Sequence, residues 1–234
     1  MKRLLIGVGC LALSLVLAGA ASALSYDQNV TNNAIFGGGN ANGSYTVDRS
    51  NGVELGIRGK LRHNASGAPE NTFNSNGDGT YSFNAGVGPT QSFPTAEWSF
   101  EWSINTDYLG TSGVKLDDLT YQLCLDTEVS QAVNYSIVFD PINGINPGNS
   151  MVFWDHSIGD NSTGSGAGDE AINAGDYATL ISSYNLAQQS WKPHWYMPGF
   201  DPTVDATYNI KLSASNSLGV VAQTEIQIIV GAGG

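Results

Sequence analysis

Cysteine is nearly absent from this sequence. The 234 residues contain two cysteines, and Cys10 lies in an N-terminal apolar run that has the features of a cleavable export signal. After cleavage only Cys124 would remain, which excludes an internal disulfide. An exported chain without such a cross-link must take its stability from its hydrophobic core.

Basic residues are also scarce. Lys2 and Arg3 belong to the export signal; without them, seven Lys and Arg remain against 21 Asp and Glu, a formal charge of −14. Nucleic acids and anionic membranes are bound by basic surfaces, so we expect neither as a partner. The same charge favours solubility and cation binding.

The one long apolar run, residues 4–17, follows Lys2 and Arg3 and precedes the small-residue motif Ala21-Ser22-Ala23. This order is that of a secretion signal, and the run is short for a bilayer span. We therefore predict a signal peptide over residues 1–23 and a mature chain without a membrane anchor. The protein would be secreted, to the cell surface, the medium or the periplasm, and residues 24–234 are enough for a single domain.

Alternation with a period of two predicts several β-strands, each with one buried and one solvated face. The Asn51-Gly52 pair predicts a hairpin. Trp98, Phe100, Trp102 and Ile104 alternate with polar residues and should form the centre of the core. The clearest segments are 53–62, 81–83, 97–105, 119–126, 133–139, 208–214 and 220–230. This pattern predicts an all-β fold, a two-sheet antiparallel β-sandwich of the jelly-roll or Ig-like kind.

One stretch, residues 155–200, departs from this pattern and is predicted to be a loop–helix insertion. A short strand over 151–154 should precede it. The helix is predicted over 177–188, with Asp176 as N-cap and an apolar stripe that packs on a sheet. The glycine-rich residues 24–42 should form an extended arm or an edge strand, which could add to the sheet of a second copy.

Several motifs carry a resemblance to a known group of proteins. They are Asn51-Gly-Val-Glu-Leu-Gly-Ile-Arg58, Asn71-Thr-Phe-Asn-Ser-Asn-Gly-Asp-Gly-Thr-Tyr-Ser-Phe83, Phe100-Glu-Trp-Ser-Ile-Asn-Thr-Asp107, Leu116-Asp-Asp-Leu-Thr-Tyr121 and Asp155-His-Ser-Ile-Gly-Asp-Asn-Ser-Thr163. The mature chain resembles secreted bacterial PEP-CTERM-associated proteins of unknown function. The resemblance implies a surface or matrix location and no activity. The sorting tail of that group is absent here, so we expect release or assembly rather than anchoring.

Two segments are candidates for calcium binding. Residues 74–80 have the one-three-five-seven spacing of a calcium loop, with Gly79 at the sharp turn. Ala85 stands where such a loop carries its bidentate Glu, and a plain turn would explain the segment equally well. The proposed ligands are Asn74, Asn76, Asp78 and the carbonyl of Thr80.

The second calcium candidate is the acidic loop after residue 154. Hard oxygen ligands on a flexible loop suit calcium, although Asp and Asn can also hydrogen-bond their own backbone in a solvated loop. The proposed ligands are Asp155, Asp160, Asn161 and Asp169.

Three aromatic residues, Trp191, Trp195 and Tyr196, are candidates for ligand binding. They stand among Pro193, Pro198 and Gly199, which predicts a rigid, shaped loop that stacks on a sugar. The alternative is that they only fix the loop to the core.

No catalytic residue is predicted. Phosphate-loop, HExxH and GxSxG motifs are absent, and Glu97 and Glu101 on one strand face would lie roughly 13 Å apart. A glycosidase pair needs roughly 5–9.5 Å. The leading hypothesis is a non-enzymatic surface or matrix protein that binds calcium or polysaccharide, or that self-assembles. The alternative is a carbohydrate-active hydrolase on a jelly-roll-like scaffold.

Overall fold

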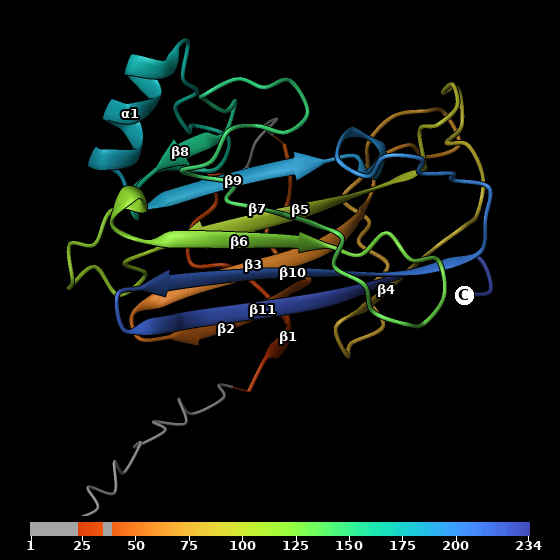
Figure 1. Ribbon diagram of the computed structural model, residues 1–234, viewed down its shortest axis with the longest axis horizontal. Coiled ribbons are helices and arrows are strands. Elements are labelled where there is room, and N and C mark those ends of the chain that lie inside the picture. The colour runs from red at the N-terminus through yellow and green to blue at the C-terminus, as the bar shows by residue number, and fades with distance from the viewer. Residues whose placement is uncertain (1–22, 35–38) are drawn as a thin grey trace, which may run out of the picture.

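Alternating residues build two β-sheets that face each other across a shared apolar core (Figure 1). The computed structural model describes residues 23–34 and 39–234, so the predicted signal peptide lies almost wholly outside the described residues. Eleven strands, one α-helix and two short 3-10 helices are described. They are β1 (Ser25–Gln28), β2 (Tyr45–Ser50), β3 (Val53–Leu61), β4 (Thr80–Phe83), β5 (Trp98–Asn105), η1 (Leu116–Asp118), β6 (Thr120–Leu125), β7 (Ile137–Phe139), β8 (Ser157–Gly159), α1 (Ala174–Ser183), β9 (Leu186–Trp191), η2 (Pro193–Trp195), β10 (Ala206–Asn216) and β11 (Gly219–Val230).

The predicted two-sheet sandwich with one helix is confirmed. One sheet has the order β1-β2-β3-β5-β9-β8 and is antiparallel throughout. The other has the order β4-β11-β10-β6-β7 and is mixed, because β4 pairs parallel with β11. The two strands are far apart in sequence, so no hairpin forces them to be antiparallel. The predicted hairpin joins β2 to β3, with Asn51 and Gly52 at positive φ as a two-residue turn requires.

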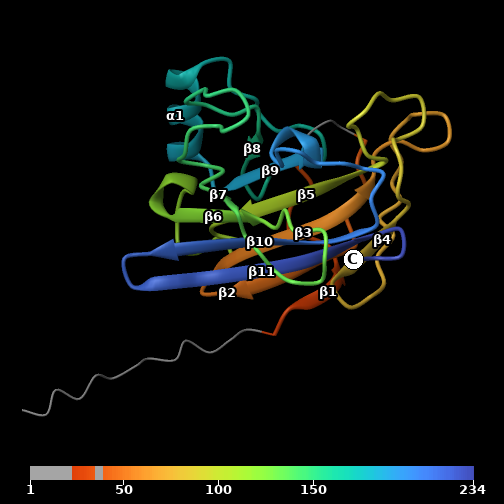
Figure 2. The same cartoon turned by 45° about the vertical axis from the view of Figure 1, so that its right-hand side comes forward.

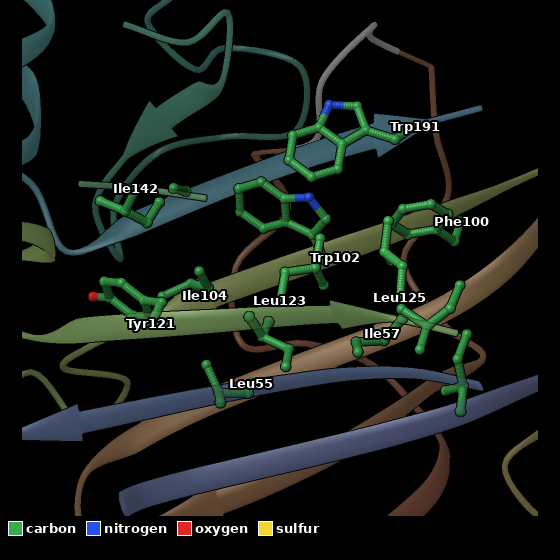
Figure 3. Packing of buried hydrophobic residues seen from close by; sticks show 14 of the residues in the cluster. Leu55, Ile57, Phe100, Trp102, Ile104, Tyr121, Leu123, Leu125, Ile142 and Trp191 are labelled. Carbon is green, nitrogen blue, oxygen red and sulfur yellow. The ribbon is translucent and has the colours of Figure 1, made fainter. Parts of the chain in front are cut away.

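The core lies between the sheets and is rich in aromatic rings. Trp98, Phe100, Trp102 and Ile104 of β5 are all completely buried, as the alternation predicts. Figure 3 shows the Trp102 and Trp191 side chains next to each other, and their ring centroids are 5.4 Å apart. This packing joins β5, a central strand of the six-stranded sheet, to its neighbour β9 through their indole rings.

The opposite face of that sheet was expected to be solvated, and this expectation is wrong. Glu54, Arg58, Lys60 and Glu101 are each at most 2% exposed. A segment that we call the strap, residues 29–34 and 39–43, covers this face. Its contacts include the Thr31 N–H to Glu54 Oε1 at 2.8 Å and the Gly43 carbonyl to Arg58 Nη1 at 2.6 Å.

The helix begins and ends earlier than predicted. It covers Ala174–Ser183, and Asn173, not Asp176, is its N-cap, accepting the Gly175 and Asp176 N–H groups. The last three residues of the predicted helix, 186–188, belong to strand β9, which pairs with β5 and β8. The apolar residues of Leu186–Trp191 fit the period of a strand as well as that of a helix. Pairing with two neighbouring strands selects the strand. The stretch 155–200 therefore supplies two strands of the sandwich, with α1 beyond β8 (Figure 1).

Three strand predictions need smaller corrections. Residues 151–154 form no strand, and Met151 and Val152 are exposed. The nearby strand is β8, which was predicted to be loop. The strand predicted over 133–139 is shorter than expected and covers only β7, Ile137–Phe139. The N-terminal arm contributes β1, an edge strand that pairs with β2 of its own chain.

Candidate functional site

A cavity of about 370 Å³ opens where the 140–155 loop meets the end of β9. Its size falls within the roughly 300–1,000 Å³ typical of small-ligand sites. All three aromatic residues predicted to bind a ligand line it. The lining residues are Asn146, Gly148, Asn149, Met151, Phe153, Asp155, Trp191, Trp195 and Tyr196.

The floor of this pocket continues the core. Trp191 is the last residue of β9 and only 1% exposed, so it is not the open stacking surface that was predicted. Its ring centroid lies 4.5 Å from that of Tyr196 and 5.5 Å from that of Trp154. The pocket is therefore built on a rigid aromatic stack.

The aromatic wall comes from η2. Pro193 occupies the first turn, where its fixed φ and missing N–H favour a helical start. The turn then presents Trp195 and Tyr196 on successive residues, with Trp195 44% exposed and Tyr196 half-buried. Trp195 is thus the most exposed aromatic residue of the pocket lining.

The polar wall comes from the 140–155 loop. The Asn146 and Asn149 side chains accept the N–H groups of Gly148 and Met151, each at 2.9 Å, which fixes the loop conformation. Asp155 is exposed and its Oδ1 accepts from Gln189 Nε2 at 3.0 Å. These contacts hold a carboxylate and two amide side chains around one opening.

Tyr196 adds a hydroxyl group to the polar wall. Burial and the charge of Asp155 raise the pKa of Tyr196 well above its usual value, and a hydrogen bond with Asn146 offsets this only in part. The hydroxyl therefore stays protonated over the physiological range. Tyr196 can donate a hydrogen bond and also pack its ring against a ligand.

The pocket combines an exposed aromatic residue with amide, hydroxyl and carboxylate groups. Aromatic faces pack against the C–H faces of a sugar ring, while amide, hydroxyl and carboxylate groups bond its hydroxyls. Among the lining residues, Asp155 is the only carboxylate. Glycoside hydrolysis by the common mechanism uses two.

Glu97 and Glu101, the two carboxylates on one strand face, are not part of the pocket lining. Glu97 Oε1 accepts the Asn84 N–H at 2.7 Å, and Glu101 is buried and ion-paired with Arg58 and Lys60. Cys124 is a buried free thiol in β6, and burial raises its pKa. The two carboxylates therefore have structural partners, and the thiol is enclosed by the fold.

The first calcium candidate, residues 74–80, forms a tight turn that uses its own side chains. Asp78 Oδ1 accepts the N–H and hydroxyl of Thr80 at 3.0 and 2.7 Å. The Thr80 carbonyl accepts the Asn76 N–H at 2.9 Å, and the Asn74 carbonyl accepts the Ser82 N–H at 3.1 Å. The proposed ligand oxygens of Asn74, Asp78 and Thr80 thus accept hydrogen bonds from nearby residues of the chain. This is what the alternative to a calcium loop, a plain turn, predicts.

The structure does not bring the second set of calcium candidates together. Asp155 lines the pocket, whereas Asp160 lies past the other end of β8 and accepts from Ser162 at 2.8 and 2.6 Å. Asn161 bonds Asn105 at 2.7 Å, and Asp169 pairs with Ile158 through the backbone. Within residues 23–34 and 39–234, no three His, Cys, Asp or Glu residues group as metal ligands do. Calcium binding stays a prediction.

Sequence reasoning missed the 140–155 side of the pocket. The signal lay in Asn146-Pro147-Gly148-Asn149, a strong turn sequence whose amide side chains order a loop. Nothing local indicates that this loop folds against η2. The aromatic residues were found because bulky side chains among prolines are conspicuous in the sequence.

Comparisons with protein families, with curated proteins and with solved structures find no significant match. The resemblance to PEP-CTERM-associated proteins therefore stays a prediction. In the part of the chain that the structure describes, no helix is long and apolar enough to cross a membrane.

Proposed function

We propose that this protein is a secreted, non-catalytic β-sandwich of the cell surface or extracellular matrix, which binds polysaccharide in the Trp195–Tyr196 pocket. The observation that carries the proposal is the pairing of an exposed Trp195 face with the Asn146, Asn149 and Asp155 side chains across a preformed cavity. Secretion is supported by the basic, apolar and small-residue segments at the N-terminus.

The rigidity of the pocket also supports binding. Its floor is the Trp191–Trp154 stack, and its wall Tyr196 packs on Phe139 at 5.5 Å between ring centroids. A preformed site loses little conformational entropy when a ligand binds. Stacking on Trp195 needs no rearrangement of the core.

The test is calorimetric or electrophoretic binding of the mature protein to a panel of soluble neutral and acidic polysaccharides. Trp195→Ala should weaken binding by about tenfold or more, as loss of an aromatic anchor does. Tyr26→Ala is the matched control, because Tyr26 is also an exposed aromatic residue, 40% exposed, but lies in β1 at the far edge of the same sheet.

Equal binding by the wild type and Trp195→Ala would reject this pocket as the site. Retained binding in Tyr26→Ala shows that the loss is not a general effect of removing a surface ring. Thermal unfolding of all three proteins should give similar midpoints, since neither substitution touches the core.

A further inference from the structure

Two basic segments meet at one end of the six-stranded sheet. Strands β3 and β9 both pair antiparallel with β5, so they run in the same direction and end on the same side. Arg62 and His63 follow β3 directly, while Lys192 and His194 follow β9. Figure 2 shows the segment after β9 beside the loop after β3. We call these four residues the basic corner.

Neither cation of the basic corner forms an ion pair among the described residues. The ion pairs of the six-stranded sheet join Arg49 to Glu54, and Glu101 to Arg58 and Lys60. Arg62 Nη1 lies 3.4 Å from the Ser190 hydroxyl, a neutral partner. Arg62 and Lys192 are therefore two neighbouring cations whose charges no direct ion pair compensates.

The four residues are close enough to act on one another. Burial lowers the pKa of His63, the Gly67 carbonyl opposes this, and the charges of Lys192 and Arg62 lower the pKa further. Burial, Lys192 and His63 in turn lower the pKa of His194. An anion placed among these groups would relieve their repulsion.

Two imidazole nitrogens in the corner have no partner among the described residues. His63 is 7% exposed; its Nδ1 lies 3.1 Å from the Gly67 carbonyl, and its Nε2, on the other side of the ring, is buried and unbonded. His194 Nδ1 is also buried without a partner. Both histidines therefore bring an unpaired ring nitrogen close to the two cations of the corner.

Trp195 joins the corner to the pocket. The Lys192 ammonium lies 5.6 Å from the centroid of the Trp195 ring, and the His194 and Trp195 rings are 6.1 Å apart. The same Trp195 lines the cavity. A ligand stacked on Trp195 would therefore have its neighbouring substituents within reach of the corner.

We propose that the basic corner binds the anionic group of an acidic polysaccharide, a carboxylate or a sulfate, whose sugar ring lies on Trp195. The proposal rests on the function proposed for the pocket and narrows its ligand. The Arg62 guanidinium can hold two oxygens of such a group and Lys192 adds a point charge.

The anion site is tested alone by NMR titration of the three histidines with sodium sulfate against sodium chloride at equal ionic strength. Sulfate should raise the pKa of His63 and His194 by about half a pH unit or more. His156 is an internal control, because it is completely buried in the core. The anion site is overturned if the histidine pKa values are the same in the two salts, or if the pKa of His156 shifts as much as the others. It is also overturned if sulfate shifts the pKa of His63 and His194 in Arg62→Gln as much as in the wild type.

The ligand class is tested with galacturonic acid oligomers, the same oligomers after reduction of their carboxyl groups to alcohols, and sulfated oligomers of the reduced form. At least one charged form should bind about tenfold more tightly than the neutral form, and Arg62→Gln and Lys192→Gln should each remove most of that difference. Lys211→Gln, in β10 of the other sheet, removes the same charge and should not change it.

The outcomes separate the two proposals. Equal binding of charged and neutral oligomers, lost in Trp195→Ala, keeps the pocket and overturns the basic corner. Charge-dependent binding that survives Trp195→Ala keeps the corner and overturns the pocket. Absence of binding by all three oligomers overturns the acidic-polysaccharide assignment, whatever sulfate does to the histidines.

Discussion

Strand β5 buries both of its faces, but against different surroundings. Trp98, Phe100, Trp102 and Ile104 meet apolar residues of the opposite sheet. Ser99, Glu101, Ser103 and Asn105 are equally buried, yet they lie under the strap or beside polar residues such as Gln188. The inner face depends on apolar contact and close packing, and the outer face depends on satisfied hydrogen bonds and ion pairs. Burial by itself therefore does not identify the core of this protein.

The largest expected effect is on the inner face. Trp102→Ala should lower the free energy of unfolding by about 3–5 kcal/mol, because it leaves a cavity between His156 and Trp191. Ser103→Ala, the next residue on the opposite face, loses one hydrogen bond with Gln188 and should cost about 1 kcal/mol. Urea unfolding of both variants measures the contrast, and equal losses would contradict it.

The second prediction breaks the outer face. Arg58 is completely buried, lies between the Tyr45 and Phe73 rings at 4.2 and 3.9 Å, and bonds Glu101 at 2.8 and 2.5 Å. Arg58→Met should cost about 3–4 kcal/mol, because the buried Glu101 then loses its guanidinium partner and keeps only Lys60 and the Asn40 amide.

The control is a triple variant that removes all three charges of this network, because Lys60 is buried and also pairs with Glu101. Arg58→Met with Lys60→Met and Glu101→Met should recover much of the loss, since buried ionic groups are often replaceable by apolar residues of similar volume. Both variants are measured by urea unfolding. A triple variant as unstable as Arg58→Met alone would show that the ionic network itself, and not the unpaired charge, stabilises this face.

The third prediction uses pH to change the inner face alone. His156 is enclosed by Trp102, Trp154 and Trp191, and burial lowers its pKa to about 3, although the Pro141 carbonyl opposes this. The unfolded chain binds the proton near pH 6.5, so the stability that neutral His156 provides is complete above pH 6.5. It is lost as the pH falls toward 3.

The measurement is the unfolding free energy of the wild type minus that of His156→Phe, which carries no titrating group there. Between pH 6 and pH 4 this difference should fall by about 2.5 kcal/mol. Subtraction removes the carboxylates common to both proteins. A difference that does not change with pH would mean that the imidazole is protonated inside the core.

The contrast between the two faces of β5 also explains which features of this protein can be predicted from the sequence. The inner face of β5 and the Asn51-Gly52 hairpin follow from local periodicity and turn chemistry, and both are observed. Glu101 and Arg58 carry no local sign of burial, because the strap that covers them comes from another part of the chain. Leu186–Trp191 fits two periods, and only pairing with β5 and β8 decides for a strand. In the pocket, Trp195 and Tyr196 were predictable from their chemistry, whereas Asn146 and Asn149 depended on a tertiary contact.

The smallest effect concerns how firmly the strap closes the outer face. Asn42 links the two halves of the strap, residues 29–34 and 39–43. Its Oδ1 accepts the Val30 N–H at 3.0 Å, and its Nδ2 donates to the Val30 carbonyl at 2.7 Å. Asn42→Ala should cost about 1 kcal/mol, because these bonds are only partly buried. The loss should be local, since the strap makes no part of the apolar core between the sheets. Hydrogen exchange tests this: the Thr31 amide, bonded to Glu54, should exchange about fivefold faster, while the Trp102 amide should not change. If both amides accelerate together, the strap and the core open as one unit, and the two faces of β5 are not independent.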